Sequence, residues 1–262
     1  MADETSISLN KYISQTGICS RREADALIRE GRVTLNGQPT RPGNRVSEGD
    51  EVRIDGKPLR PKPKALYIAF NKPVGIVCTT DSKEPKNIVR YINHPQRLFP
   101  IGRLDKPSEG LIFLTNDGDI VNKILRAGNE HEKEYLVSVK QPVTPEFVQR
   151  MSSGIPILGT ITKECRVEAT GPHTFRIILT QGLNRQIRRM CEYLGYEVSR
   201  LQRVRIMNVS LGKLRVGEWR ELTDAEVKEI MRMVARSSKT EEASRGQGAK
   251  KQPFKRKKKR KK

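Results

Sequence analysis

The sequence predicts an α+β protein of 262 residues, with a small N-terminal module followed by a larger domain built on a largely antiparallel, mixed sheet. Three observations lead to this prediction. Apolar residues alternate in several short segments, amphipathic helices lie between them, and a basic stretch with three prolines at residues 57–64 separates the two parts. We therefore expect one domain at residues 1–60, a second at 61–235, and a disordered basic tail at 236–262.

The N-terminal module is expected to begin with two short helices. Apolar residues at helical spacing mark the first: Leu9, Tyr12 and Ile13. The second begins with a capping box, because the Ser20 hydroxyl can accept a hydrogen bond from the Glu23 amide while the Glu23 carboxylate reaches back. Gly31 then marks the end of that helix, since glycine readily adopts the left-handed conformation.

A small β element should complete this module. Val33 and Leu35 alternate with polar residues and lead into Asn36-Gly37, a strong turn signal for a hairpin. A further strand is expected at residues 51–54. Two helices and a small sheet would together form one compact unit.

The second domain mixes strands and helices. Four strands are expected, at residues 66–70, 111–114, 135–139 and 175–179. Four helices are expected, around residues 120–125, 144–151, 187–194 and 223–234. Because the strands follow one another through hairpins or irregular links rather than in β-α-β units, we expect the sheet to be mainly antiparallel.

The chain carries a formal net charge of +21, with 51 Lys and Arg against 30 Asp and Glu. Twelve basic and two acidic residues lie between positions 239 and 262, so the rest of the chain still carries +11. Such an excess predicts a polyanionic partner, and nucleic acid is the commonest one. A merely solubilising surface is the alternative.

Several classes of protein are disfavoured. The longest purely apolar run has six residues, at 65–70, far too short for a membrane span, and the acidic start has no apolar signal region. Four scattered cysteines form no Cys-x-x-Cys pair: Cys19, Cys78, Cys165 and Cys191. We expect them to be buried thiols of a cytoplasmic protein rather than disulfides or zinc ligands. The three histidines have no metal-ligand spacing, so we expect no metal. No P-loop or Gly-x-Gly-x-x-Gly occurs, so we expect no nucleotide cofactor.

One acidic residue has a setting that permits chemistry. Asp105 follows Gly102-Arg103-Leu104 and precedes Gly110, after which an apolar strand begins. A loop held by rigid structure is a frequent place for catalytic groups. By itself this setting is equally that of an ordinary turn residue.

Four ordered segments resemble the pseudouridine synthases, in particular the branch that carries an N-terminal S4 domain (the RsuA family). They are the Asp105 loop at 102–112 and the segments 71–75, 133–137 and 182–190. The N-terminal module in turn resembles the S4 RNA-binding domain at residues 9–13, 20–24 and 31–37. The resemblance covers about residues 8–235. It is closest to a subtype that acts on 23S ribosomal RNA, with further support at residues 124–129 and 205–211.

The resemblance implies an enzyme that isomerises uridine to pseudouridine in ribosomal RNA, with 23S as the expected target, without cofactor or metal. Within the same chemistry, 16S ribosomal RNA or tRNA is the alternative substrate. A noncatalytic S4-type RNA-binding or ribosome-assembly factor is the alternative of another class. We further expect a monomer that does not contact membranes.

The same resemblance implies roles for individual residues. Asp105 would be the nucleophile, attacking covalently or acting on a sugar intermediate. It must be ionised, and Arg188 matches the position that pairs with it, with Arg185 as the alternative. Tyr135 would pack against the target base, and Arg103 would help to rearrange the flipped-out nucleotide.

Basic residues of both domains are candidates for RNA binding. In the N-terminal module they are Lys11, Arg21, Arg22 and Arg29. In the second domain Arg185 and Arg189 join them, since the apolar stripe of their expected helix leaves both on another face. Solvated positions without a partner are the alternative for all six.

Overall fold

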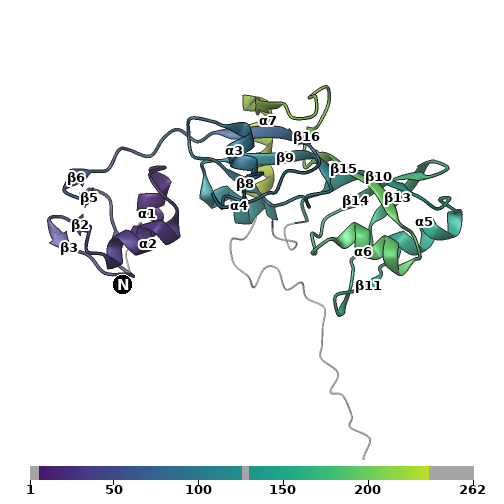
Figure 1. Cartoon of the computed structure of the whole chain (residues 1–262), viewed down its shortest axis with the longest axis horizontal. Helices are drawn as coiled ribbons and strands as arrows, with labels where there is room; N and C mark the ends of the chain where they lie inside the picture. The colour runs from purple at the N-terminus through teal and green to yellow at the C-terminus, as the bar shows by residue number, and fades with distance from the viewer. Residues whose placement is uncertain (1–5, 126–129, 236–262) are drawn as a thin grey trace, which may run out of the picture.

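The computed structural model describes residues 6–125 and 130–235. The expected tail at 236–262, and residues 126–129 of one matched segment, lie outside the described residues. Figure 1 shows the N-terminal module at one end, joined by an extended segment to a larger body of sheet and helices. The α+β architecture predicted from the sequence is confirmed.

The N-terminal module packs two helices against small sheets. Its elements are β1 (Ile7–Ser8), α1 (Leu9–Gln15), α2 (Arg21–Arg29), β2 (Val33–Leu35), β3 (Gln38–Pro39), β4 (Arg45–Val46), β5 (Val52–Ile54) and β6 (Lys57–Pro58). One described sheet has the strand order β3-β2-β5-β6, and β1 pairs with β4. The apolar faces of both helices meet Val33, Val46 and Val52 in a core of their own.

Local signals shaped this module as the sequence predicted. The Ser20 hydroxyl accepts a hydrogen bond from the Glu23 amide at 3.2 Å, and the Glu23 carboxylate accepts one from the Ser20 amide at 2.6 Å. Asn36 and Gly37 adopt φ values of 50° and 77°, which a tight hairpin of this twist requires at both central positions.

The larger body is organised around one sheet, whose described strands run in the order β13-β14-β10-β15-β9-β7-β17. Two short strands join it at the side, β8 on β9 and β16 on β15. Its members are β7 (Tyr67–Lys72), β8 (Phe99–Ile101), β9 (Glu109–Thr115), β10 (Lys133–Val139), β13 (Arg166–Gly171), β14 (Thr174–Leu179), β15 (Val198–Ile206), β16 (Val209–Ser210) and β17 (Trp219–Glu221). A separate hairpin joins β11 (Pro156–Ile157) to β12 (Thr160–Ile161).

Among the described strand pairs of this sheet, only β9 and β15 run parallel, so the sheet is mixed and largely antiparallel. Gly110 makes this parallel pairing feasible. A Cβ atom there would lie 2.2 Å from the Arg203 carbonyl oxygen, and the φ of Gly110 is +102°. Any other residue would push β9 away from β15, directly after the Asp105 loop.

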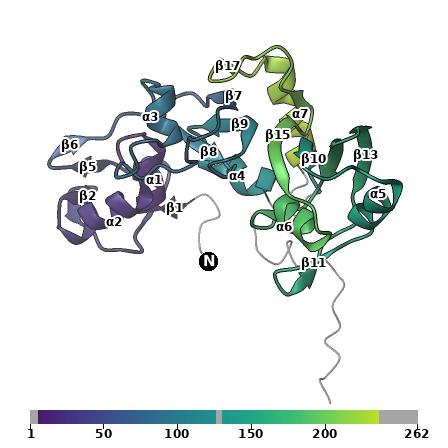
Figure 2. The same cartoon turned by 45° about the vertical axis from the view of Figure 1, so that its right-hand side comes forward.

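Five helices of the described residues cover the sheet: α3 (Ile88–Ile92), α4 (Gly118–Leu125), α5 (Pro145–Ser152), α6 (Gln186–Tyr193) and α7 (Asp224–Val234). Helices α4 and α7 bury one face of β7 and β9, while α3 and the segment before Asp105 bury the other. Helices α5 and α6 cover β10 and β14 in a second core (Figure 2). The Asp105 loop and the segment before α6 therefore belong to different cores of the same sheet.

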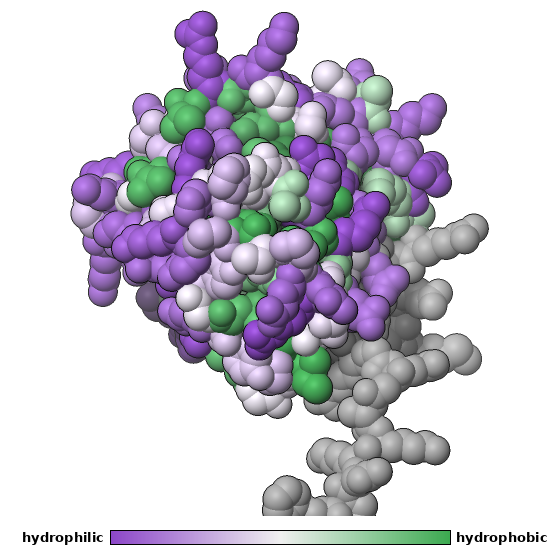
Figure 3. Space-filling view, turned by 90° about the vertical axis from the view of Figure 1, so that its right-hand side faces the viewer, coloured by the Kyte–Doolittle hydropathy of each residue, from purple (hydrophilic) through white to green (hydrophobic). Residues whose placement is uncertain are grey.

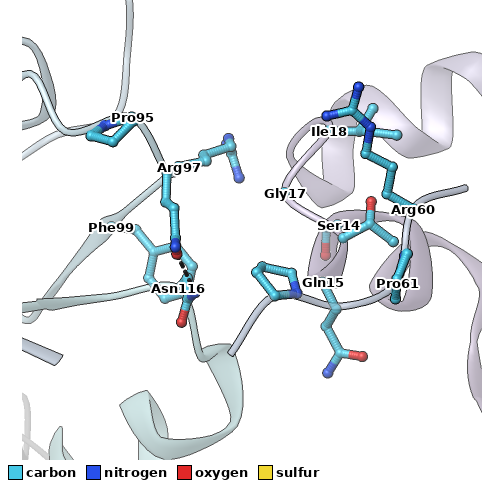
Figure 4. A pocket seen from close by; sticks show the side chains of 13 residues that line it. Ser14, Gln15, Gly17, Ile18, Arg60, Pro61, Pro95, Arg97, Phe99 and Asn116 are labelled. Atoms are coloured by element: carbon cyan, nitrogen blue, oxygen red, sulfur yellow. Dashed lines mark hydrogen bonds between the residues drawn. The ribbon is translucent and has the colours of Figure 1, made fainter. Parts of the chain in front are cut away.

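The N-terminal module touches the larger body at a polar contact. Lys11 on α1 forms an ion pair of 2.6 Å with Asp119 on α4, and Gln15 donates to the same carboxylate at 3.4 Å. A cleft of about 370 Å³ opens beside this contact. It is bordered by Arg60 of the linker on one side and by Arg97 of the larger body on the other (Figure 4).

All four cysteines are free, but the expectation that all are buried is wrong for two: Cys78 and Cys191 are buried, whereas Cys19 and Cys165 are partly exposed. In residues 6–125 and 130–235 no helix is long and apolar enough to cross a membrane. On the end of the molecule shown in Figure 3, hydrophilic residues predominate and hydrophobic ones gather in small separate patches.

Candidate active site

A cleft of about 590 Å³ lies where the Asp105 loop, the start of β10 and the segment before α6 meet. Side chains from distant parts of the sequence line it, among them Arg103, Asp105, Lys133, Tyr135, Arg185 and Arg203. Three of the four residues predicted to be catalytic therefore face one cleft: Asp105, Tyr135 and Arg103. The fourth, Arg188, lies behind the Asp105 loop.

The Asp105 loop is held firmly on both sides. Leu104 is buried and its amide donates to the Cys78 sulfur at 3.4 Å. The Ser108 amide donates to the Asp105 carbonyl at 3.0 Å, which closes a turn immediately after the acid. The carboxylate itself stays about one third exposed toward the cleft. The loop thus presents a carboxylate from a rigid support.

The guanidinium closest to Asp105 is that of Arg185 and not that of Arg188. Arg185 Nη1 lies 3.6 Å from Asp105 Oδ2. The expected helix begins only after Arg185, which caps α6 with a φ of 50°. This left-handed backbone turns the Arg185 side chain out of the helical register and toward the loop, which helical spacing alone could not show.

Arg188 contacts the backbone that follows Asp105. Its Nη2 donates to the Pro107 carbonyl at 3.2 Å and to the Ser108 hydroxyl at 3.3 Å, and its Nη1 donates to the Val198 carbonyl at 3.3 Å. Burial and the charge of Arg185 lower the pKa of Arg188, while the charge of Asp105 acts in the opposite direction. Instead of the predicted ion pair with Asp105, Arg188 thus forms hydrogen bonds that connect α6 to the Asp105 loop.

Tyr135 and Lys133 extend from the same face of β10, two residues apart, into the cleft. Across the sheet, Tyr135 is in register with Arg203 of β15, whose guanidinium carbon lies 5.9 Å from the Tyr135 ring centroid. Arg103 is exposed at the rim of the same cleft. The cleft is therefore lined both by an aromatic ring and by an exposed cation.

The sequence reasoning missed a group of buried cations at this site. Lys72, Lys133 and Arg203 are 0%, 7% and 5% exposed. Lys133 could have been suspected, because a strand residue two positions before Tyr135 must share its face. Arg203 gave no such signal, since arginines recur along β15 in a segment that was not expected to be a strand.

The predicted RNA-binding residues differ in their exposure and in their contacts. Arg21, Arg22 and Arg29 are exposed on α2. Lys11 instead pairs with Asp119, and Arg189 folds back on Asn184, donating to its carbonyl at 3.1 Å and to its side-chain oxygen at 3.3 Å. Arg185 combines its exposed position with the contact to Asp105.

Two known protein families match this chain. The RNA pseudouridylate synthase family matches residues 66–193, and the S4 domain family matches residues 8–52. The dual-specificity RNA pseudouridine synthase RluF of Escherichia coli K12 is 58% identical over 240 residues, covering 91% of this chain and 83% of the relative. The ribosomal large subunit pseudouridine synthase B of Bacillus subtilis is 34% identical over 231 residues, covering 85% and 94%.

A solved structure has a similar fold. The crystal structure of a pseudouridylate synthase superposes with a TM-score of 0.64 at 30% sequence identity. The similarity covers 86% of this chain and 99% of the other. Both the N-terminal module and the larger body thus have counterparts among known proteins.

Proposed function

Since the chain belongs to the RNA pseudouridine synthases that carry an N-terminal S4 domain, we infer that it isomerises uridine to pseudouridine in ribosomal RNA. The observation that carries this function is that Asp105 and Tyr135 line the same cleft. The chain that holds them is 58% identical to a pseudouridine synthase. A protein that only binds RNA has no need of a rigidly held carboxylate in a cleft.

We assign the chemical step to Asp105. The reaction must break the N1–C1′ bond, turn the base and rejoin it through C5. Asp105 either attacks C1′ and forms a covalent intermediate, or removes a proton from the sugar; both routes use its carboxylate as the reacting group. Its support by Leu104 and Ser108, and its partial exposure, suit a group that must reach a bound nucleotide.

The surrounding residues are proposed to act on the carboxylate and on the base. Arg185 keeps a positive charge beside Asp105, and Arg188 positions the loop that carries it. Tyr135 offers an aromatic surface to the base that has left its stack, a contact worth about 1–3 kcal/mol. Arg103 at the rim is proposed to occupy or rearrange the space left by the flipped nucleotide.

For the RNA target we propose 23S ribosomal RNA, with tRNA as a second substrate. One relative's name specifies the large ribosomal subunit, and the name of the 58% identical relatives specifies dual specificity. RNA recognition depends on shape and on unstacked bases, which accounts for two substrates that share a local structure. We further propose that the protein acts as a cytoplasmic monomer.

We propose that RNA capture is divided between residues 1–60 and residues 61–235. The exposed arginines of α2 would contact phosphates: Arg21, Arg22 and Arg29. The cleft between the two parts, with Arg60 and Arg97 at its borders, would let the RNA backbone continue toward the active site (Figure 4).

The direct test is to incubate the purified protein with unmodified 23S ribosomal RNA, 16S ribosomal RNA and tRNA transcripts, and to map pseudouridine at nucleotide resolution. We expect pseudouridine at defined uridines of 23S ribosomal RNA and, as the second substrate, of tRNA. If product formed only in 16S ribosomal RNA or only in tRNA, the proposal of 23S ribosomal RNA as the target would be wrong. RNA binding without product in any of the three would favour the noncatalytic RNA-binding or ribosome-assembly factor.

A further inference from the structure

Within the described part of the chain, the buried charged side chains are all positive. Among residues 6–125 and 130–235, Lys72, Lys133 and Arg203 are buried, whereas no Asp or Glu is buried to the same degree. Removing an ion from water without an ionic partner costs about several kcal/mol even after the surroundings relax. Two of these three cations, Lys133 and Arg203, line the cleft beside Asp105, and their burial there needs a physical explanation.

These cations donate hydrogen bonds to backbone carbonyl groups, which replace water but do not neutralise the positive charge. Lys72 Nζ donates to the Pro73 and Ile76 carbonyls at 2.8 Å, and Lys133 Nζ donates to the His131 carbonyl at 2.8 Å. Arg203 Nε donates to the Leu111 carbonyl at 2.6 Å. All four acceptors are neutral backbone groups, so the charges of Lys133 and Arg203, which line the cleft, are left to act on whatever enters it.

Arg203 is the best placed of the three. It lines the cleft, it lies beside the Tyr135 ring, and the close approach of Gly110 fixes its backbone. Its buried Nη2 atom has no hydrogen-bond acceptor within the part of the chain that the structure describes. The contact with Tyr135 alone, worth about 0.5–2 kcal/mol, does not account for burying a guanidinium with a donor unused.

We propose that Arg203, assisted by Lys133, stabilises the negative charge that the uracil base acquires when its bond to the ribose breaks. This inference rests on the proposed function. It gives the buried cations the role of a preorganised environment, aimed at the place where charge develops during the reaction.

The charge balance of the step is the same on either route. When the Asp105 carboxylate attacks C1′, the N1–C1′ electron pair leaves with the base, so that a neutral ester and a uracil anion form. When Asp105 instead removes the C2′ proton, a neutral carboxylic acid, a neutral unsaturated sugar and a uracil anion form. In both cases the single negative charge moves from Asp105 to the base, toward the wall that Tyr135, Lys133 and Arg203 build.

The test compares two leaving groups in single-turnover reactions. RNA with uridine or with 5-fluorouridine at the target position is used, and consumption of the N-linked target nucleoside is followed. Fluorine makes the uracil anion intrinsically more stable, so this substrate depends less on the protein for stabilisation. We expect Arg203→Met to slow the uridine reaction about 10²–10³-fold, the usual loss for one such group, and the 5-fluorouridine reaction at least tenfold less. Arg203→Lys, which keeps the charge, should recover most of the rate.

A purely structural role would slow both substrates equally, and an unchanged ratio of the two rates would overturn the proposal. Arg200→Met is the matched control, because Arg200 lies on the same strand, is 61% exposed and pairs with Glu109. It should retain the wild-type ratio. If thermal unfolding shows that Arg203→Met does not fold, Arg203→Gln replaces it, since its amide can still donate to Leu111 without the charge. A wild-type protein that forms no pseudouridine would refute the proposed function itself, whereas an active wild type with an unchanged ratio in the variant refutes only this inference.

Discussion

Arg185 Nη1 lies 3.6 Å from Asp105 Oδ2, while Arg188, one turn further along, donates its hydrogen bonds to the backbone that follows Asp105. Two arginines of one short segment thus make different contacts with the Asp105 loop. One supplies charge at the carboxylate, and the other holds the loop in place. The carboxylate, its counter-charge and its support can therefore be tested separately.

Replacing the Asp105 carboxylate should abolish catalysis without weakening RNA binding. Asp105→Asn keeps the size of the side chain and its exposure, so we expect RNA affinity to stay within about twofold of wild type. Product formation should fall by about 10⁴-fold or more, as expected when a reacting group is removed. Gel-shift titration and pseudouridine mapping measure the two quantities. Turnover at the wild-type rate in this variant would show that Asp105 is not the reacting group.

The two arginines should give different signatures. Arg185→Gln removes a partly exposed charge, so we expect a rate loss of roughly tenfold with little change in thermal stability. Arg188→Gln removes hydrogen bonds to Pro107, Ser108 and Val198, and should lower the unfolding free energy by about 1–3 kcal/mol. It should also lower the rate about 10²-fold through displacement of the loop. Equal effects of both variants on stability and rate would contradict the assignment of different roles to Arg185 and Arg188.

Lys133 should make stability depend on pH. Burial and the charge of Arg203 lower the pKa of Lys133 from 10.5 to about 8. Between these pH values the unfolded chain holds a proton that the folded chain has released, so the stability contributed at this site rises with pH across the window. The full difference corresponds to about 3 kcal/mol.

Lys133→Met removes this contribution. Below about pH 8 the variant should be more stable than wild type, and its advantage should shrink as the pH rises toward 10. Urea unfolding of both proteins at several pH values measures the difference, in which the titration of other groups cancels. A constant difference over the whole range would show that Lys133 is not the group responsible.

The exposed arginines of α2 should contribute to RNA capture. We expect the triple change of Arg21, Arg22 and Arg29 to Gln to weaken binding and to lower the slope of log affinity against log salt by about 2, if each contacts a phosphate. Catalysis at saturating RNA should change little. Arg150→Gln, an exposed arginine on α5, is the control. Deleting residues 1–60 should weaken RNA capture further, and equal affinity of the truncated protein would argue against this role.

The cleft beside the Lys11–Asp119 contact should make a smaller contribution to RNA affinity than the arginines of α2. The double variant Arg60→Gln and Arg97→Gln removes the two cations at its borders. We expect a loss of affinity of several-fold for a long ribosomal fragment that spans both parts of the protein, and none for a short stem-loop that reaches only the active site. Hydroxyl-radical footprinting would show protection lost over the outer segment alone. Unchanged protection would exclude this cleft from the RNA path.

Much of the local structure was predictable because its causes are local. The capping boxes that begin at Ser20 and Thr223 depend on residues three positions apart, and both are present. The turn at Asn36-Gly37 depends on two residues that tolerate positive φ. Asp105 was predicted as the central residue of a loop on the strength of its resemblance to a family, and it does face the cleft.

Other features arise only when distant strands meet. Strand β15 was not predicted, because its many arginines hide the alternation of buried and exposed positions. Its antiparallel pairing with β10 brings Arg203 beside Tyr135, and its parallel pairing with β9, which Gly110 permits, brings Arg203 to the strand that follows the Asp105 loop. The sequence by itself indicated most of the helices, several of the strands and the turn residues, and the resemblance to a family singled out Asp105 as the predicted reacting carboxylate. The tertiary structure alone decided which arginine lies beside that carboxylate and which cations are buried, because a backbone turned to positive φ at Arg185 and the burial of a charge depend on neighbours that are far away in the chain.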